Sequence, residues 1–144
     1  MTESDVYQKD GFTITTDKNS LDVEFIHNFL ANESYWARGR SLELVQRSID
    51  NSVNFGVFDG HKQIGFARVV TDLATFAYLG DVFIIEEYRG RKLAVWLIEV
   101  ITSHPKLQGF RRWILSTRDA HELYRRFGFT ELDDPTKWMG RFNT

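Results

Sequence analysis

The stretch YLGDVFIIEEYRGRKLAVWLIEVITSH, residues 78–104, decides the fold that we expect for this chain. Residues 79–85 form a short apolar run interrupted only by Gly80 and Asp81, which is typical of a buried central strand. The end of the stretch has the apolar spacing of a helix packed on a sheet, at Leu93, Trp96, Leu97, Val100 and Ile101. The stretch therefore predicts a central strand, a polar turn and a helix.

The polar turn, residues 86–92, carries three cationic side chains, Arg89, Arg91 and Lys92. At the start of a helix, unpaired backbone N–H groups and the positive end of the helix dipole attract an anion, and arginine or lysine neutralises its charge. This arrangement predicts a phosphate site. The plainer alternative is a solvated basic surface, which short motifs of this kind frequently turn out to be.

Residues 89–94, RGRKLA, resemble the acyl-CoA pyrophosphate loop of the GCN5-related N-acetyltransferases (GNAT), written Arg/Gln-x-x-Gly-x-Gly/Ala. Arg89 and Ala94 fit this pattern, but Lys92 stands where the family usually has glycine. Glycine allows a close approach of the backbone and dihedral angles that other residues avoid. Lys92 can be accommodated if that residue is already helical, and its charge could help hold the anion.

Bulk composition limits the function classes. A chain of 144 residues, 42% apolar and 15% aromatic, has the length and composition of one compact domain, which we place at residues 1–144. The net charge of −2 argues against a nucleic-acid partner, and the absence of cysteine excludes thiolate metal sites and cysteine nucleophiles; we expect no metal. No apolar run spans a bilayer and the polar N-terminus lacks a signal sequence, so we expect no membrane partner and a cytoplasmic location.

The first half of the chain predicts a strand at residues 12–16 and a helix capped by Ser20, with the apolar stripe Leu21, Phe25, Phe29 and Leu30. A second helix is predicted from Ser41, with its inward positions at Leu42, Val45 and Ile49. Residues 53–58 and 63–70 then flank Asp59-Gly60, a dipeptide suited to a type I′ hairpin turn.

The second half predicts a strand at 110–116, a helix opened by a capping box of Asp119 and Glu122, and a strand at 129–132. Residues 137–142 are a further candidate edge strand. This order of elements predicts an α/β (α+β) fold, a mixed, largely antiparallel sheet of six or seven strands flanked by four helices on both faces.

Residues 120–129, AHELYRRFGF, resemble the Ala-x-x-Leu-Tyr-x-x-x-Gly-Phe signature that ends the GNAT core. A plain capped helix explains Leu123, Phe127 and Gly128, but it does not require tyrosine at position 124. With both motifs in this order, the chain is identified as a member of the GNAT family over residues 12–129. The resemblance implies an acyltransferase with acetyl-CoA as the acyl donor co-substrate.

The resemblance also implies roles for individual residues. Tyr124 would be the acid that protonates the departing thiolate, although the bland alternative is a packing aromatic. Backbone N–H groups near Val82, Phe83 and Ile84 would hold the pantetheine arm and polarise the thioester carbonyl. The pyrophosphate would rest on the turn and the start of the helix, at Arg89, Gly90, Arg91, Lys92, Leu93 and Ala94.

Asp81 is a charged residue inside an apolar strand, where an unpaired carboxylate is costly. Its surroundings are similar to those of an aspartate near the amine in polyamine acetyltransferases, which implies that Asp81 attracts the amine or takes its proton through water. The alternative is an ion pair with Arg111 or Arg112 on the neighbouring strand. His121 has a suitable pKa for a base but is expected on the surface.

The connection between the first two helices, residues 32–40, is rich in aromatic and cationic groups, and its candidate substrate-binding residues are Tyr35, Trp36 and Arg40. An aromatic ring there suits an amine and an arginine suits a carboxylate, whereas Trp36 alternatively plugs the sheet edge. We expect acetyl transfer to the primary amine of a small molecule. The alternatives are a peptide or protein N-acetyltransferase and a non-catalytic acyl-CoA-binding module, which Lys92 keeps open. A homodimer stays open as well, because dimers are common among relatives.

Overall fold

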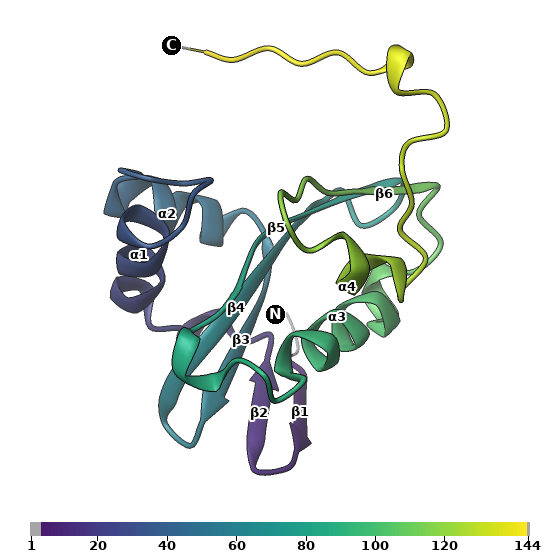
Figure 1. The fold of residues 1–144 in the computed structure, drawn as a ribbon. Coiled ribbons are helices and arrows are strands. Elements are labelled where there is room, and N and C mark those ends of the chain that lie inside the picture. The colour runs from purple at the N-terminus through teal and green to yellow at the C-terminus, as the bar shows by residue number, and fades with distance from the viewer. Residues whose placement is uncertain (1–3, 144) are drawn as a thin grey trace.

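The computed structural model describes residues 4–143; residues 1–3 and 144, which belong to the predicted domain, lie outside this part. In it a six-stranded sheet runs in the order β1-β2-β3-β4-β5-β6 (Figure 1). Neighbouring strands are antiparallel except for β5 and β6, which are parallel. The strands are β1 (Val6–Lys9), β2 (Phe12–Thr15), β3 (Val53–Asp59), β4 (Lys62–Thr71), β5 (Phe76–Ile84) and β6 (Arg112–Ile114). The predicted mixed, largely antiparallel sheet is confirmed.

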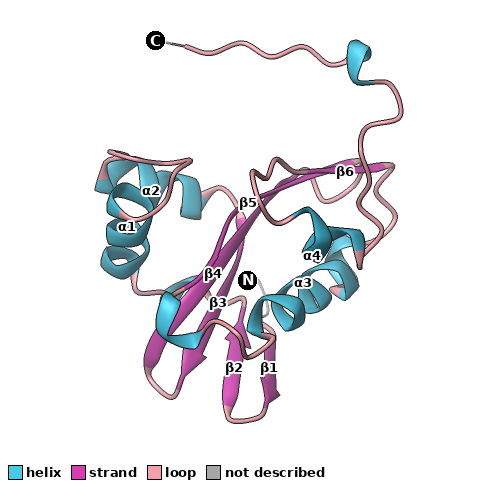
Figure 2. Ribbon diagram, in the orientation of Figure 1, coloured by secondary structure: helices cyan, strands magenta, loops and turns pink. Residues whose placement is uncertain are grey.

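Helices cover both faces of the sheet, as predicted. Within residues 4–143 the α-helices are α1 (Val23–Asn32), α2 (Leu42–Asp50), α3 (Leu93–Ser103) and α4 (His121–Arg125). Figure 2 shows α1 and α2 on one side of the strands, with α3 and α4 on the other. None of the helices in the described part of the chain is long and apolar enough to cross a membrane.

The two faces of β5 belong to two apolar clusters, which together hold the central strand in place. Phe83 points to the α1 side, where its ring stacks on Phe29 with centroids 3.8 Å apart and planes 7° apart. Ile84 packs with the other cluster, which contains the fully buried Leu97 and Ile101 of α3. This alternation is what a strand buried on both sides requires, and it explains the apolar run that the sequence shows.

The strand predictions fail at the two ends of the chain. β1 was not predicted; it is a short edge strand with mostly exposed residues and hence no apolar pattern. The strands predicted at 129–132 and 137–142 are absent from the described residues, and β6 is shorter than the predicted 110–116. Met139 and Phe142 are 97% and 99% exposed, so the C-terminal segment has no face to bury, and Pro135 opens a short 3-10 turn there instead.

Two helix starts differ from the predicted ones. α1 is capped by Asp22, whose carboxylate accepts the Phe25 N–H at 3.1 Å, while Ser20 lies in a preceding 3-10 turn. The capping box predicted at Asp119 does not form, because the N-cap position of α4 is Ala120, whose N–H is taken by the Thr117 hydroxyl. These shifts of one or two residues leave the apolar stripes in place.

Two further expectations need correction. Leu42, predicted to point inward from α2, is 45% exposed, while Val45 and Ile49 are buried as expected. In the β3–β4 hairpin Asp59 pairs with Lys62, so the two loop residues are Gly60 and His61. Only Gly60 has a positive φ, 61°, which excludes the predicted type I′ turn because that turn needs positive φ at both loop positions.

Candidate active site

β5 loses its neighbour half-way along its length. β6 pairs only with Phe76, Ala77 and Tyr78, so the rest of β5 has an open edge on that side within the described residues. The register against β4 also shifts between Phe66 and Arg68, which pair with Phe83 and Gly80. At this bulge Asp81 adopts a left-handed conformation with φ 54°. β5 therefore has an open edge and a bulge at the residues that the sequence analysis predicted for the reaction centre.

The open edge presents backbone polar groups. The carbonyl of Ile84 accepts a hydrogen bond from Arg89 Nε at 2.9 Å, and so it points away from β4. Because the N–H and C=O of one strand residue point to the same side and successive residues alternate, the N–H groups of Ile84 and Val82 face the open edge. Val82 and Ile84 are two of the three residues predicted to hold the pantetheine arm by their backbone N–H groups. The backbone N–H of the third, Phe83, faces β4.

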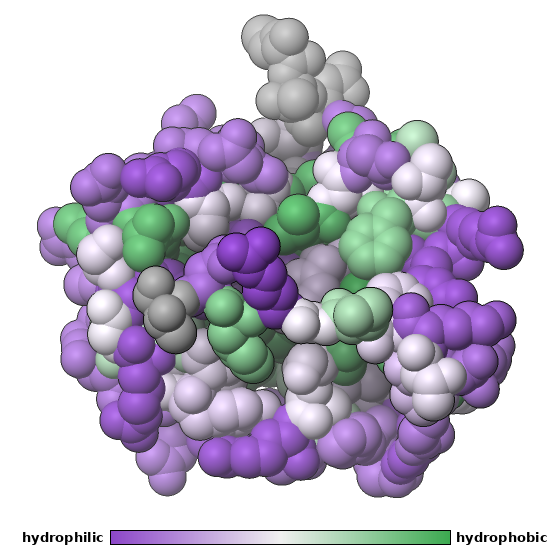
Figure 3. Space-filling model, turned by 90° about the horizontal axis from the view of Figure 1, so that it is seen from above, coloured by the Kyte–Doolittle hydropathy of each residue, from purple (hydrophilic) through white to green (hydrophobic). Residues whose placement is uncertain are grey.

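A cavity of about 620 Å³ lies beside this open edge. Its walls come from the α1–α2 connection, β4, β5, the β6–α4 connection, α4 and the C-terminal segment. Both predicted catalytic residues and all three predicted substrate-binding residues line it: Tyr124, Asp81, Tyr35, Trp36 and Arg40. Figure 3 looks down on the molecule from above; its rim is mostly hydrophilic, and its middle holds apolar, intermediate and hydrophilic side chains together. The fold thus brings together five residues that the sequence suggested separately.

Asp81 lies at the centre of a buried polar cluster in this cavity. Its side chain is 3% exposed, and its carboxylate accepts bonds from Trp36 Nε1, Arg40 Nη1 and Arg68 Nε, each 2.9 Å long. We call these four residues the Asp81 cluster. The alternative partners Arg111 and Arg112 are wrong, because β6 ends its pairing with β5 before Asp81. Both carboxylate oxygens are occupied, and the bonds fix the α1–α2 connection on the sheet.

Tyr124 is the titratable group on the α4 side of the cavity. The residue is 8% exposed, and burial, with smaller contributions from Tyr35 and Asp119, raises its pKa to about 12. No described residue makes a hydrogen bond with its hydroxyl, and the residue lines both this cavity and a smaller one beside α4. At neutral pH this phenol is therefore protonated and has a proton to donate.

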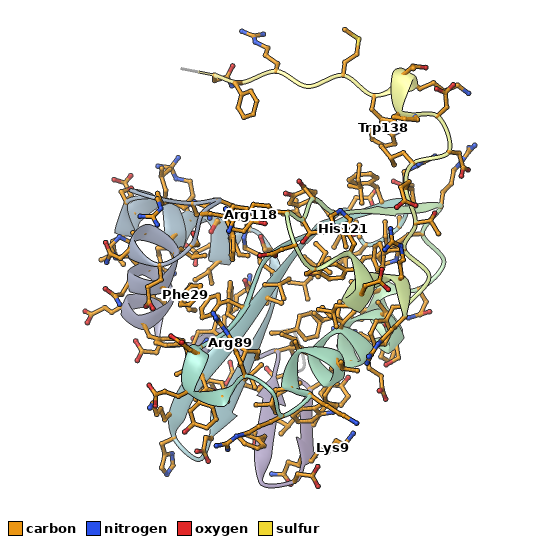
Figure 4. The ribbon with its side chains drawn as sticks, in the orientation of Figure 1. Lys9, Phe29, Arg89, Arg118, His121 and Trp138 are labelled. Carbon is orange, nitrogen blue, oxygen red and sulfur yellow. The ribbon has the colours of Figure 1, made fainter. Side chains whose placement is uncertain are left out.

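Two loops meet over the cavity through Tyr35 and Arg118. The Tyr35 hydroxyl accepts the Arg118 backbone N–H at 2.9 Å, and the Arg118 guanidinium lies 3.8 Å from the centre of the Tyr35 ring. Figure 4 shows Arg118 at the upper end of the region between the two helix pairs and Arg89 at its lower end. Cationic side chains therefore stand at both ends of the open edge of β5.

The predicted phosphate turn, residues 89–94, leads into α3, and the first backbone N–H groups of this helix are uncapped. Lys92 is the N-cap residue and makes no side-chain cap bond, so the N–H groups of Leu93 and Ala94 lack an intrahelical partner. Lys92 is left-handed, with φ 61° and ψ 21°, so the helical conformation that would accommodate a lysine here is not adopted. This conformation suits glycine, which explains the residue that the family pattern has there. Gly90 also has positive φ, 83°.

Sequence reasoning missed two arginines of the cavity, Arg68 and Arg118. Arg68 had a readable signal, since it is a charge inside the apolar strand QIGFARVV, beside the strand that carries Asp81. Arg118 lies in a polar loop and gave no such signal. His121 is exposed, as expected, and borders a smaller cavity under α4. Within residues 4–143 no three His, Asp or Glu side chains are grouped to hold a metal ion.

The family model described as "Acetyltransferase (GNAT) family" matches residues 23–129, which include β5, the phosphate turn and Tyr124. The chain belongs to the GNAT acetyltransferase family. The membership that the two motifs implied is therefore confirmed, together with the fold that it carries.

Similar proteins come from bacteria and a fungus. A crystal structure of a candidate GNAT acetyltransferase from Xanthomonas campestris pv. campestris is 47% identical, with a TM-score of 0.90 over 92% of this chain and 93% of that one. A candidate acetyltransferase of Gibberella zeae is 25% identical over 86% of this chain and 81% of its own length. An acetyltransferase predicted in Clostridium acetobutylicum, crystallised with acetyl-CoA, is 13% identical with a TM-score of 0.67, covering 91% of this chain and 94% of its own, and so shows the fold alone.

Proposed function

We propose that this GNAT protein transfers an acetyl group from acetyl-CoA to the primary amine of a small molecule. The observation that carries the proposal is that Tyr124 lines the same cavity as Val82 on the open edge of β5. An acid and a backbone N–H donor, that of Val82, on one cavity are what acyl transfer from a thioester requires. A similar fold holds acetyl-CoA in the Clostridium acetobutylicum protein.

The donor would bind through the backbone. The uncapped N–H groups of Leu93 and Ala94 and the positive end of α3 suit the pyrophosphate, and Arg91 and Lys92 supply neutralising charge. Arg89 has a second task, because its Nε bond to Ile84 ties the turn to β5. The N–H groups of Val82 and Ile84 suit the pantetheine arm and the thioester carbonyl.

The transfer itself needs three events. The nitrogen lone pair of the deprotonated amine attacks the thioester carbonyl carbon, and backbone N–H groups stabilise the resulting oxyanion. The carbon–sulfur bond then breaks and the sulfur takes the phenolic proton of Tyr124, while the nitrogen gives its extra proton to water. The Tyr124 phenolate then takes a proton from water, which restores the starting state. A phenol with a pKa of about 12 is fully protonated at the start of this sequence.

We consider two roles for Asp81. It attracts the amine or takes its proton through water, as predicted, or it positions the residues that it binds. Its three hydrogen bonds favour positioning, because they hold Trp36 and Arg40 against the bulge of β5. Asp81→Asn separates the two roles. If the carboxylate serves the amine, the variant loses use of the amine and keeps acetyl-CoA affinity; if it is only structural, both fall together.

The proposal is tested by titrating the protein with acetyl-CoA in a calorimeter and by measuring CoA release with a panel of amines. We expect micromolar affinity, about −8 kcal/mol, and amine-dependent release of CoA. Tyr124→Phe should lower kcat by about 100-fold or more with little change in acetyl-CoA affinity. Tyr7→Phe, on the distant edge strand β1, is the matched control and should leave kcat unchanged.

Other outcomes identify other functions. Binding without CoA release from any amine would make the protein an acyl-CoA-binding module, and release with peptides alone would make it a peptide acetyltransferase. Unchanged turnover in Tyr124→Phe would remove Tyr124 from the mechanism.

A further inference from the structure

The acceptor side of the cavity carries an excess of positive charge. Its lining includes three arginines, Arg40, Arg68 and Arg118, and two aspartates, Asp81 and Asp119. Asp81 is paired with two of these arginines, whose charges offset the attraction of its carboxylate for an incoming cation. A free ammonium or polyamine entering here would therefore meet a lining with a formal charge of +1. The arrangement disfavours a polycationic acceptor and favours an acceptor with its own anionic group.

Arg40 has the donors to bind such a group. Its guanidinium donates one hydrogen bond, from Nη1 to Asp81, and its side chain makes no other hydrogen bond within the described residues. The edge formed by Nε–H and Nη2–H is therefore unengaged, and this parallel pair is the geometry that binds a carboxylate in a bidentate way. The Arg40 side chain is 25% exposed and lines the cavity, whereas Arg68 is 14% exposed and also bonds the Ser52 hydroxyl.

Arg40 is also held rigidly and close to the reaction centre. Its backbone carbonyl bonds a ring nitrogen of His27 on α1 at 3.0 Å, and its guanidinium is fixed by Asp81. Asp81 directly precedes Val82, whose N–H faces the open edge of β5 where the thioester is proposed to lie. An acceptor whose carboxylate binds Arg40 would therefore place an amine a few bonds away near the thioester.

We propose that the acceptor is an amino-carboxylic acid whose carboxylate binds Arg40 while its amine attacks the thioester. The proposal rests on the proposed acetyl transfer and narrows its acceptor class. Tyr35 and Trp36, with 40% and 39% of their surfaces exposed, stand beside Arg40 and give the side chain of the acid an apolar wall. Arg40 acts here as a specificity residue and takes no part in proton transfer.

The test compares two amino acids with their uncharged amides, with an amine that lacks the carboxyl group and with a polyamine. L-phenylalanine, its amide and 2-phenylethylamine are assayed for CoA release beside glycine, glycinamide and spermidine. We expect kcat/KM at least tenfold higher for each acid than for its amide. The comparison is conservative, because the amide has the lower amine pKa and so more of the reactive free amine at neutral pH.

Variants assign the preference to Arg40. Arg40→Gln should bring the ratio of acid to amide close to one, mainly through a higher KM for the acid, and Arg40→Lys should keep part of it. Arg38→Gln is the matched control, since Arg38 is exposed on the same connection, and its ratio should equal that of the wild type. The wild-type ratio alone decides the question if Arg40→Gln does not fold.

The failures of the two proposals are distinct. Acetylation of amides, phenylethylamine or spermidine as good as that of the acids overturns the acidic acceptor and leaves acetyl transfer standing. No CoA release with any of the six amines overturns both proposals for small amines. An acid preference that survives in Arg40→Gln contradicts the assignment to Arg40.

Discussion

The two ends of the open edge of β5 are built in opposite ways. The phosphate turn, residues 89–94, uses consecutive residues and presents backbone N–H groups at an exposed helix start. The Asp81 cluster uses side chains from the α1–α2 connection, β4 and β5, and buries its central carboxylate. A site made from backbone groups of consecutive residues tolerates substitution of its side chains. A cluster made from side chains distant in the sequence depends on each of those side chains. The difference predicts where substitutions do the most damage.

The largest effect is expected at Asp81. Asp81→Ala leaves Arg40 and Arg68 without their shared counter-charge, and removing one partner of a buried ion pair costs about 3–5 kcal/mol. We expect the free energy of unfolding to fall by about 3 kcal/mol, the lower end of that range, because both arginines retain some contact with water. Urea unfolding measures this loss. Asp119→Ala, an exposed aspartate on the same cavity, should change stability by less than about 0.5 kcal/mol; equal losses in the two variants would contradict the comparison.

The next effect concerns Tyr124 and pH. Its pKa is about 12 in the folded protein and near 10 when unfolded, so the stability due to this proton is complete below pH 10 and is lost as the pH rises toward 12. Between pH 10 and 12 the wild type should lose up to about 1.4 kcal/mol per pH unit relative to Tyr124→Phe. Unfolding of both proteins in this range measures the difference, in which the titration of other tyrosines and lysines cancels. Parallel curves would mean that the phenol is not buried in solution.

The same contrast explains what the sequence could predict. The phosphate turn and the helix of Tyr124 are local, so their residues stand next to one another in the chain and were found as motifs. The substrate-side residues Tyr35, Trp36 and Arg40 were suggested by composition, but their contacts were not, because register and loop path decide which side chains meet. Arg68 was missed for this reason, although it is 13 residues from Asp81.

Errors in the fold follow a related rule. Central elements with a buried face were predicted, since burial imposes a pattern on the sequence. Edge elements were not: β1 is exposed and patternless, and the C-terminal residues 137–142 have strand-like composition but no neighbour to pair with in the described structure. Lys92 was misjudged because a backbone with positive φ leaves no trace in sequence when glycine does not occupy it.

A smaller effect is expected in the phosphate turn at Gly90. Its φ of 83° lies in the left-handed region, and no atom stands within 4 Å of the position that a Cβ would occupy. Gly90→Ala should therefore cost only backbone strain, about 1–2 kcal/mol of stability, and it should weaken acetyl-CoA binding as the turn relaxes. Thermal unfolding and calorimetry measure the two losses. Gly140→Ala, at an open position without positive φ, is the control and should be nearly neutral.

The smallest effect has the opposite sign and is expected at Lys92. Lysine at φ 61° is strained, so Lys92→Gly relieves the strain, while the greater freedom of glycine in the unfolded chain offsets part of the gain. We expect a net gain of about 0.5–1 kcal/mol. Lys92→Ala is the matched variant, because it removes the same charge but keeps the Cβ, and it should show no gain. If the charge of Lys92 helps to hold the pyrophosphate, both variants lose acetyl-CoA affinity at low salt, and the glycine variant loses less. Equal stability of the two variants would mean that the left-handed N-cap costs nothing here, and lysine would then be as suitable as glycine at the start of this helix.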